Sequence, residues 1–207
     1  MTVADAPLAA AIRGLGTGQV PVVVEPLLQA RGDGDALKAA LRKAVQGIGF
    51  EYFVVSRRNR LIRDIGSKWS CWGTHPSEWA DLSRARNYAA IEPIRRSAYR
   101  AAVPLVWDQA RFSPLAETRE YFASAASFGI CSGVSMAVYT GHRSYVDFFD
   151  VYTAARTITD AHRKEVVRRM ADLWALGAYG LLLLPDGVFG NPARKSFRTF
   201  THRRARR

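Results

Sequence analysis

The chain has 207 residues, of which 48% are hydrophobic and 23% charged, and this size suits one ordinary domain. Such a composition excludes whole-chain disorder and a collagen-like fibre. Two cysteines, Cys71 and Cys131, cannot build a disulfide framework or a four-cysteine zinc site. We therefore expect reduced thiols in a cytoplasmic protein.

The net charge is +12, from 30 basic and 18 acidic residues, and it invites a nucleic-acid interpretation. Much of the excess lies in a basic C-terminal tail that we place at residues 181–207. Seven basic residues gather near its end: Arg194, Lys195, Arg198, Arg203, Arg204, Arg206 and Arg207. The tail would bind nucleic acid weakly, if at all, through salt-sensitive phosphate contacts, and a solvated terminus is the simpler alternative.

The N-terminal residues 1–34 are rich in Ala, Gly, Pro and Val, and we interpret them as a loosely ordered leader. Asp5 stands where a secretory signal would carry basic residues, so export is not expected. The longest nearly apolar run, residues 175–185, is about half of the roughly 20 residues that a bilayer span requires. No membrane span is predicted.

We place the domain at residues 35–180. Hydrophobic periodicity predicts the helices and strands of its first half. Apolar residues recur at helical spacing from Asp35 until Gly47. The β-branched and aromatic run 50–55 and the stretch 60–69 then predict a hairpin. A helix follows over residues 77–90, since Pro76 suits a helix start.

The second half begins with a helix that Ser113 and Pro114 open and Gly129 ends. Strand-like runs at 132–140 and 144–153 predict a second hairpin. Thr159 can cap a last helix with a wide apolar face. This order predicts an α+β fold, an α/β/α sandwich with a central antiparallel sheet covered by helices.

The usual catalytic motifs do not occur in this sequence: there is no Walker loop, no His-Glu-x-x-His, no Gly-x-Ser-x-Gly and no Cys-x-x-Cys. Cys71 and His75 could form a nucleophile–base pair, but a small core cysteine and a structural histidine are the simpler interpretation. The four histidines show no metal-ligand spacing. We therefore expect no catalytic residues, no metal and no cofactor.

One pattern of spaced residues is a more specific functional signal than these motifs. Trp79 is followed fourteen residues later by the pair Glu92-Pro93, then fourteen later by Trp107, and residues 121–133 read Tyr-Phe-Ala-Ser-Ala-Ala-Ser-Phe-Gly-Ile-Cys-Ser-Gly. From about Leu37 to Gly180 the chain resembles the autoinducer-binding domain of LuxR-type quorum-sensing regulators. The resemblance implies a pocket for an N-acyl homoserine lactone.

The resemblance also implies roles for particular residues. Trp79 would donate its indole N–H to the lactone carbonyl, and Trp107 would wall the pocket. Glu92 replaces the family's usual aspartate as acceptor for the amide N–H of the signal. Gly133 matches a glycine near the sheet, where the missing Cβ permits close approach.

Two further positions depart from the family pattern. A tyrosine that binds the acyl carbonyl falls at His75, and a second pocket tyrosine falls at Ser83. If His75, Trp79 and Ser83 share one helix face, the head-group end of the pocket has changed twice, so a different small signal or an empty pocket remains open. Tyr88 is a further candidate ligand contact, with core packing as its alternative.

The resemblance implies a DNA-binding domain after the sensor, and the residues after Gly180 cannot build its helix-turn-helix. We therefore expect a stand-alone sensor that forms a homodimer or pairs with a full-length regulator. An apolar helix face would serve as the pairing surface: Val166, Val167, Met170, Leu173 and Trp174. A small-molecule buffer, a ligand-independent interaction protein and a nucleic-acid anchor remain alternatives.

Overall fold

A computed structural model describes residues 21–59, 70–101, 104–109, 116–138, 145–185 and 187–189. Within these residues the fold centres on an antiparallel sheet of five strands in the order β2-β1-β5-β4-β3. The strands are β1 (Tyr52–Asn59), β2 (Ser70–Gly73), β3 (Leu105–Asp108), β4 (Ser132–Val138) and β5 (Tyr145–Thr153).

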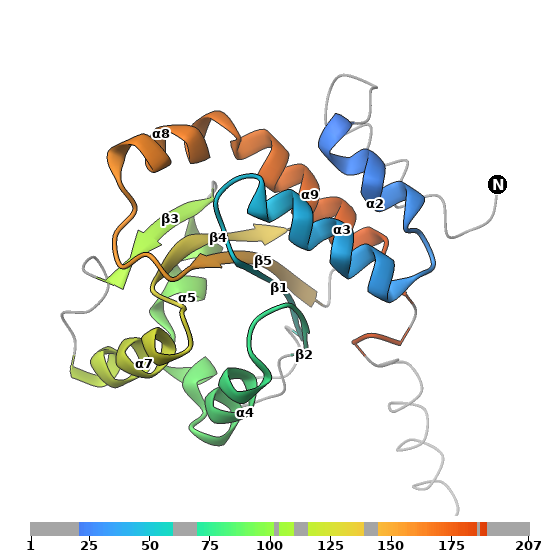
Figure 1. Ribbon diagram of the computed structural model, residues 1–207. Coiled ribbons are helices and arrows are strands. Elements are labelled where there is room, and N and C mark those ends of the chain that lie inside the picture. Colours follow the sequence, from blue (N-terminus) through green and yellow to red (C-terminus); the bar gives the residue numbers. More distant parts are fainter. Residues whose placement is uncertain are drawn as a thin grey trace, which may run out of the picture.

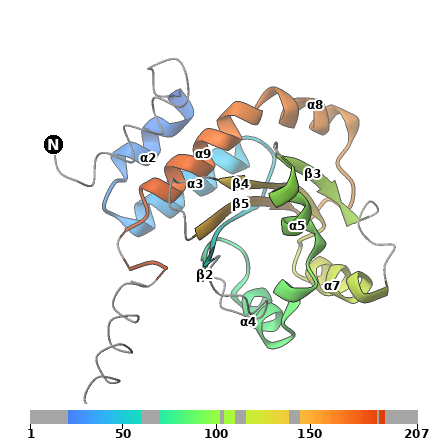
Figure 2. The same ribbon diagram turned by 180° about the vertical axis from the view of Figure 1, so that it is seen from behind.

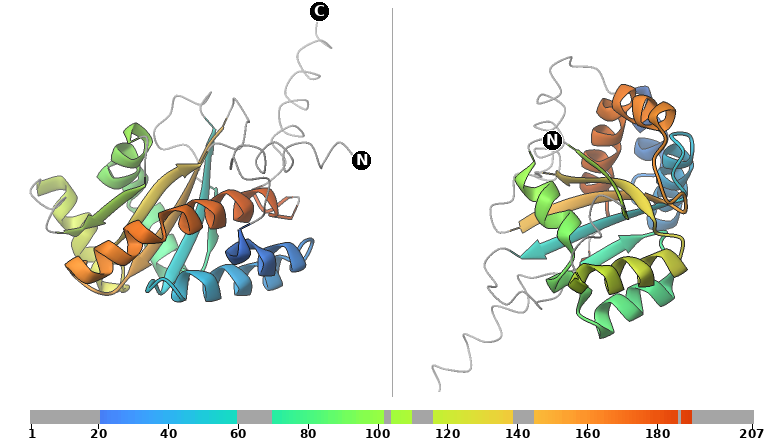
Figure 3. Two further views of the ribbon diagram at one scale, coloured as in Figure 1. Left: turned by 90° about the horizontal axis from the view of Figure 1, so that it is seen from above. Right: turned by 90° about the vertical axis from the view of Figure 1, so that its left-hand side faces the viewer.

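Helices cover both faces of the sheet, so the predicted α+β sandwich with a central antiparallel sheet is confirmed (Figures 1 and 3). One face carries η1 (Val22–Val24), α2 (Glu25–Gln29), α3 (Gly34–Gln46), α8 (Asp160–Arg168) and α9 (Met170–Leu182). The other carries α4 (Ser77–Ala85), η2 (Tyr88–Ala90), α5 (Pro93–Arg100) and α7 (Ala116–Ser127). Seen from behind, α5 lies against β3 and β4 (Figure 2).

Local sequence signals explain where several helices start. The Asp33 carboxylate accepts hydrogen bonds from the backbone N–H groups of Asp35 and Ala36, both at 3.0 Å, and so caps α3. Thr159 Oγ1 caps α8 by accepting from the N–H of His162 at 3.2 Å. Pro93 occupies the first turn of α5, where its missing N–H leaves no hydrogen bond unmade.

Alternation along the strands divides the core into two parts, because successive side chains of a strand point to opposite faces of the sheet. The packing face, covered by α3 and α9, is mainly apolar and buries seven apolar strand residues: Phe53, Val55, Val134, Met136, Val138, Phe149 and Val151. The site face, covered by α4, α5 and α7, is aromatic and includes Val54, Trp107 and Tyr152.

The close packing of α9 on the sheet depends on a glycine. A Cβ at Gly177 would lie 2.8 Å from Cβ of Phe149 on β5. Because that distance is shorter than real Cβ contacts, a larger residue would push α9 away from the packing face.

The second part of the expected leader, residues 21–34, packs on the core. Residues 1–20 lie outside the described residues, but Val24 and Leu27 are completely buried in the core of the packing face. The interpretation of residues 21–34 as leader was therefore wrong, because a composition rich in small residues does not reveal what those residues will pack against. The domain also extends past Gly180, since Leu181 and Leu183 are buried.

A cation–π contact attaches the segment after α9 to the sheet. The guanidinium of Arg57 on β1 lies 5.0 Å from the ring centroid of Phe189 and donates to both oxygens of Asp147, at 2.7 and 3.0 Å. Residues 191–207, with most of the basic tail, lie outside the described part of the chain.

Several predicted elements have different limits in the structure. The predicted last helix is broken at Arg169 into α8 and α9, and the helix expected over 77–90 ends at Ala85. The hairpin of β4 and β5 is confirmed, whereas the strand expected at 60–69 falls outside the described residues. Helix α5 and the short strands β2 and β3 were not predicted.

No helix among the described residues is both long and apolar enough to cross a membrane.

Candidate functional site

An aromatic cluster fills the space between the site face and helices α4 and α7. The indole of Trp79 lies parallel to the ring of Tyr88 at 5.7 Å between centroids, and it meets Tyr121 edge-on at 5.7 Å. Phe128 lies 5.9 Å from the same indole. Because these rings come from α4, η2 and α7, they join three segments that are far apart in sequence around one tryptophan.

Trp79 keeps its polar atom available although only 7% of its surface is exposed. None of the hydrogen bonds among the described residues uses its indole N–H. Tyr88, in contrast, engages its hydroxyl with Ser124 Oγ at 3.0 Å. Of these two stacked rings, Trp79 is thus the one whose donor is unpaired within the described part of the chain.

Trp107 forms the wall of the cluster on β3. Its indole N–H donates to Ser135 Oγ on β4 at 3.2 Å, and its ring lies 5.9 Å from that of Tyr152. Gly133 stands opposite Trp107 in the sheet, and a Cβ there would lie 2.1 Å from the carbonyl oxygen of Val151. Only glycine fits at this position, whatever the site binds.

A buried charged triad lies beside the aromatic cluster and consists of Glu92, Arg95 and Asp150. Arg95 Nη1 is 3.1 Å from Glu92 Oε2, and Arg95 Nε and Nη2 each donate to Asp150 Oδ2 at 3.2 Å. The exposed side-chain fractions are 8% for Glu92, 14% for Arg95 and 0% for Asp150. Two carboxylates thus share one guanidinium in a largely desolvated place.

Strand register explains how the triad reaches the centre of the sheet. Asp150 on β5 stands between Val54 on β1 and Ser135 on β4. Glu92 and Arg95 come from the first turn of α5, one helical step apart, which brings both side chains to the same side. A hydrogen bond with Tyr121 connects Glu92 to the aromatic cluster.

The titration behaviour of the triad reflects this burial. Desolvation raises the pKa of Glu92, although Arg95 opposes the shift. For Arg95, burial alone would lower the pKa, but the Glu92 and Asp150 carboxylates outweigh it and raise the pKa well above its usual value. The guanidinium is therefore charged at all accessible pH values, and it is Glu92 that can accept a proton.

Three polar atoms near the triad are buried and lack a hydrogen-bond partner among the described residues: Ser56 Oγ, His75 Nδ1 and Asp150 Oδ1. Ser56 lies on β1 two residues after Val54, the partner of Asp150, so both side chains point to the site face. Native structures leave few buried polar atoms unpaired, and each one calls for an explanation such as a ligand or a bound water.

Cys71 and His75 do not behave as a catalytic pair. Cys71 keeps some solvent contact on β2, but desolvation by the surrounding protein raises the pKa of its thiol. Burial, and then the charge of Arg95, lowers the pKa of His75 to about 4. Both shifts disfavour the thiolate–imidazolium form that a cysteine nucleophile needs.

The structure brings some of the predicted ligand contacts together and separates others. Trp79, Tyr88 and Trp107 belong to one buried aromatic cluster, and Glu92 adjoins it. His75 precedes α4, whose N-cap is Pro76, so it does not share a helix face with Trp79 as expected. Ser83 is half-buried on α4, one turn after Trp79.

Sequence reasoning missed Arg95 and Asp150. The i, i+3 spacing of Glu92 and Arg95 was a usable signal for an ion pair. An acid inside the apolar run of β5 was a second signal, because a buried carboxylate requires a partner. The sequence did not reveal which residue is the partner of Asp150, since Arg95 and Asp150 are 55 positions apart.

The residues expected to form a pairing surface divide between core and surface. Val166 and Leu173 are completely buried in the core of the packing face, so their assignment to a pairing surface was wrong. Met170 and Trp174 pack partly buried against the same core. Val167 is the exposed member, with 60% of its surface accessible.

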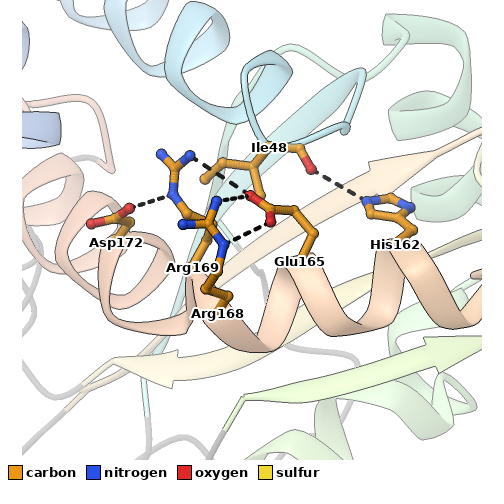
Figure 4. Close-up of polar contacts among 6 residues, drawn as sticks. All are labelled: Ile48, His162, Glu165, Arg168, Arg169 and Asp172. Carbon is orange, nitrogen blue, oxygen red and sulfur yellow. Dashed lines mark hydrogen bonds and ion pairs between the residues drawn. The ribbon is translucent and has the colours of Figure 1, made fainter.

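Charged contacts lie at the junction of α8 and α9 (Figure 4). Glu165 accepts from Arg168 at 2.6 and 2.8 Å, and Arg169 Nε donates to Asp172 at 2.5 Å. On the same helix, His162 Nε2 approaches the carbonyl oxygen of Ile48 at 3.3 Å. Glu165 also lies 3.9 Å from Arg169, the residue between the two helices.

The described part of the chain has no cluster of three or more side chains that could hold a metal ion.

An antiparallel sheet between two helical layers, with an aromatic and charged cluster enclosed on one face, defines a class of α/β/α sandwich domains. Residues 33–179 match the family described as the autoinducer binding domain. The chain therefore belongs to this family, as the resemblance in its tryptophan and glycine pattern indicated. The family is a signal-binding domain of transcriptional regulators and not a class of enzymes.

Two regulators show related sequences. The HTH-type quorum-sensing regulator RhlR of Pseudomonas aeruginosa is 26% identical over 141 residues, which cover 67% of this chain and 55% of that protein. The transcriptional activator YukR of Yersinia ruckeri is 25% identical over 92 residues, which cover 44% of this chain and 37% of that protein. The chain thus spans about half or less of the length of these relatives.

Solved structures share the fold. The N-acylhomoserine lactone dependent LuxR family factor CepR2 of Burkholderia cenocepacia has a TM-score of 0.64 at 22% identity, covering 78% of this chain and 92% of that one. Escherichia coli SdiA has a TM-score of 0.62 at 18% identity, covering 86% and 75%. SdiA in complex with octanoyl-rac-glycerol has a TM-score of 0.57 at 15% identity, covering 98% and 78%.

Proposed function

We propose that this chain binds an N-acyl homoserine lactone or a related small signal on the site face, between the sheet and helices α4, α5 and α7. The observation that carries the proposal is the indole N–H of Trp79, for which the described residues provide no acceptor, in an aromatic cluster that adjoins the buried Glu92. A dry aromatic site with a few polar groups is the usual chemistry of small-molecule recognition.

Each of the central residues has a distinct part in this proposal. Trp79 donates to a carbonyl of the signal, and Glu92 accepts from its amide N–H. Trp107 walls the site, since its own N–H is already paired with Ser135. Tyr88, Gly133, His75 and Ser83 complete the set, Gly133 by letting β4 and β5 pair closely.

Binding can be measured as a thermal shift of the purified chain against acyl homoserine lactones of increasing acyl length. A ligand at 100 times its Kd adds about 2.7 kcal/mol to the free energy of unfolding. Trp79→Phe keeps an aromatic ring and removes the donor, so we expect about a tenfold loss of affinity. Trp72→Phe, on the packing face, is the matched control and should bind like the wild type. If no lactone of any length shifts the melting temperature, the lactone version of the proposal fails.

We further propose that the chain modulates quorum-sensing transcription by dimerising, either with itself or with a full-length regulator of the same family. Val167 on α8, exposed to 60%, is the apolar residue that supports a contact there. A heterodimer with one DNA-binding domain would lose the paired half-site contacts that operators require. The chain would then act as an inhibitor.

The pairing proposal is tested by adding the purified chain to a full-length regulator and following operator binding. Excess chain should weaken binding, and Val167→Asp should abolish this effect without lowering the melting temperature of the chain. Unchanged operator binding at excess chain would refute the pairing role. Salt-sensitive operator binding by the chain alone would favour the basic-tail alternative instead.

A further inference from the structure

The charged triad holds one more acid than base. Glu92 and Asp150 share the single guanidinium of Arg95, and all three side chains are largely enclosed by protein. A buried carboxylate is costly unless a positive charge or several hydrogen-bond donors compensate it. The triad by itself does not provide full compensation unless Glu92 carries a proton.

Among the unpaired atoms around the triad, Asp150 Oδ1 can only accept, whereas Ser56 Oγ can donate or accept and the role of His75 Nδ1 depends on the tautomer. Both contacts from Arg95 to Asp150 end on Oδ2, which leaves Oδ1 buried without a partner in the described structure. Ser56 Oγ and His75 Nδ1 are also buried without a hydrogen-bond partner among the described residues. His75 is neutral near pH 7, because its pKa is lowered to about 4 by burial and by Arg95, so Nδ1 can accept a hydrogen bond.

These atoms belong to one place in the fold. Asp150 and Ser56 stand on neighbouring strands, diagonal to each other on the site face. Arg95 lowers the pKa of His75 through its charge, which places the imidazole within the electrostatic range of the triad. A group that satisfies Asp150 Oδ1 must therefore bring a donor, and a positive charge would also balance the surplus acid of the triad.

We propose that the signal bound at this site carries an amine-bearing head group, whose N–H donors pair with Asp150 and Glu92, next to an apolar chain that packs among the aromatic rings. This inference rests on the proposed function and narrows its ligand class. An ammonium has three donors and one positive charge, whereas an anionic head would face the two carboxylates. Entry of the head group has to displace the side chains that now seal Asp150 Oδ1.

The test compares three probes with the same octanoyl chain and amide N–H but different heads. N-octanoyl ethylenediamine has an ammonium head, N-octanoyl homoserine lactone is neutral, and N-octanoyl glycine has a carboxylate. We expect calorimetric Kd values about tenfold lower for the ammonium probe than for the lactone, and the weakest binding for the carboxylate.

Asp150→Asn should remove the advantage of the ammonium probe, because it keeps the side-chain shape and removes the charge. Asp147→Asn is the matched control: Asp147 lies on the same strand, on the opposite face of the sheet, where it pairs with Arg57. It should leave the order of the three probes unchanged. If Asp150→Asn does not fold, Ser56→Ala provides the second test and should weaken the ammonium probe more than the lactone.

The outcomes separate this inference from the proposed function. If the lactone binds as tightly as the ammonium probe or more tightly, the amine head is refuted and signal binding stands. If Asp150→Asn leaves every Kd unchanged, the unpaired oxygen is satisfied by an ordered water and the inference again fails. If none of the probes binds, both proposals fail together.

Discussion

At the centre of the sheet, the two faces differ in the side chains that they bury. On the packing face, strand residues such as Phe149 and Val151 meet α3 and α9 through apolar contacts alone. On the site face, the same strands carry Ser56 and Asp150, which are equally buried but polar. Residues next to each other in one strand thus contribute to a stabilising core or to a site that keeps unpaired atoms.

This difference indicates that the packing face mainly stabilises the domain, whereas the site face holds the polar groups of the candidate site. Apolar burial stabilises in proportion to area and makes no demand on partners, whereas buried polar groups cost free energy until they are satisfied. The packing face can therefore support a site face that is less stable than it could be. Three experiments test this division, in order of decreasing expected effect.

The largest effect is expected for Arg95→Met, which leaves Glu92 and Asp150 buried without a cation. We expect the free energy of unfolding in urea to fall by about 3 to 5 kcal/mol. Combining it with Glu92→Met and Asp150→Val replaces the whole triad by apolar side chains and should recover stability to within about 1 kcal/mol of the wild type.

The triple variant should also bind none of the three octanoyl probes. A triple variant that binds them normally would show that the triad is structural. The difference between the two faces would then have no role in ligand binding.

A moderate effect is expected on the packing face. Val151 is completely buried on β5, and Val151→Ala removes the equivalent of two methylene groups and leaves a small cavity. The free energy of unfolding should decrease by about 2 to 3 kcal/mol. The Kd of a bound probe, measured where the variant is folded, should remain the same. A change of more than about tenfold, or about 1.4 kcal/mol, would show that the two faces are not independent.

The smallest effect is a pH dependence that belongs to the site face. The pKa of His75 is lowered to about 4, so the unfolded chain binds a proton before the folded chain does. The stability contribution of the neutral imidazole is complete above about pH 6.5 and is lost as the pH falls towards 4. Allowing for partial solvent screening, we expect a loss of about 1 to 2 kcal/mol.

His75→Gln isolates this contribution. Glu92 has a raised pKa, so its own contribution to stability has the opposite sign and is lost as the pH rises through its folded value. Because Glu92 is present in both proteins, the difference between wild type and His75→Gln follows His75. A difference that stays constant between pH 7 and 4 would contradict the buried, neutral imidazole.

Much of the fold was readable from the sequence because its signals are local. Asp33 and Thr159 cap helices whose first turns lie within three residues of them. The strand-like runs at 132–140 and 144–153 indicated a hairpin, and the spacing of Trp79, Glu92 and Trp107 indicated the family. These signals depend on backbone sterics and side-chain period, which act over a few residues.

Other properties depended on which segments the fold brings together. Val166 and Val167 are neighbours of the same residue type, yet one is completely buried and the other 60% exposed. By sequence alone, Val24 was assigned to a loose leader. In the structure it is buried in the core, because η1 packs against α9. Burial is a property of the neighbours that a residue acquires, and those neighbours are distant in sequence.

The sequence by itself determined the class of fold, the starts of several helices and the family, because short-range sterics and periodicity specify them. Only the tertiary structure decided that Arg95 pairs with both Glu92 and Asp150, and that Ser56, His75 and Asp150 each bury an atom without a partner among the described residues. The physical reason is that desolvation and charge pairing depend on distance in space, and the chain acquires those distances only when the sheet and its helices assemble.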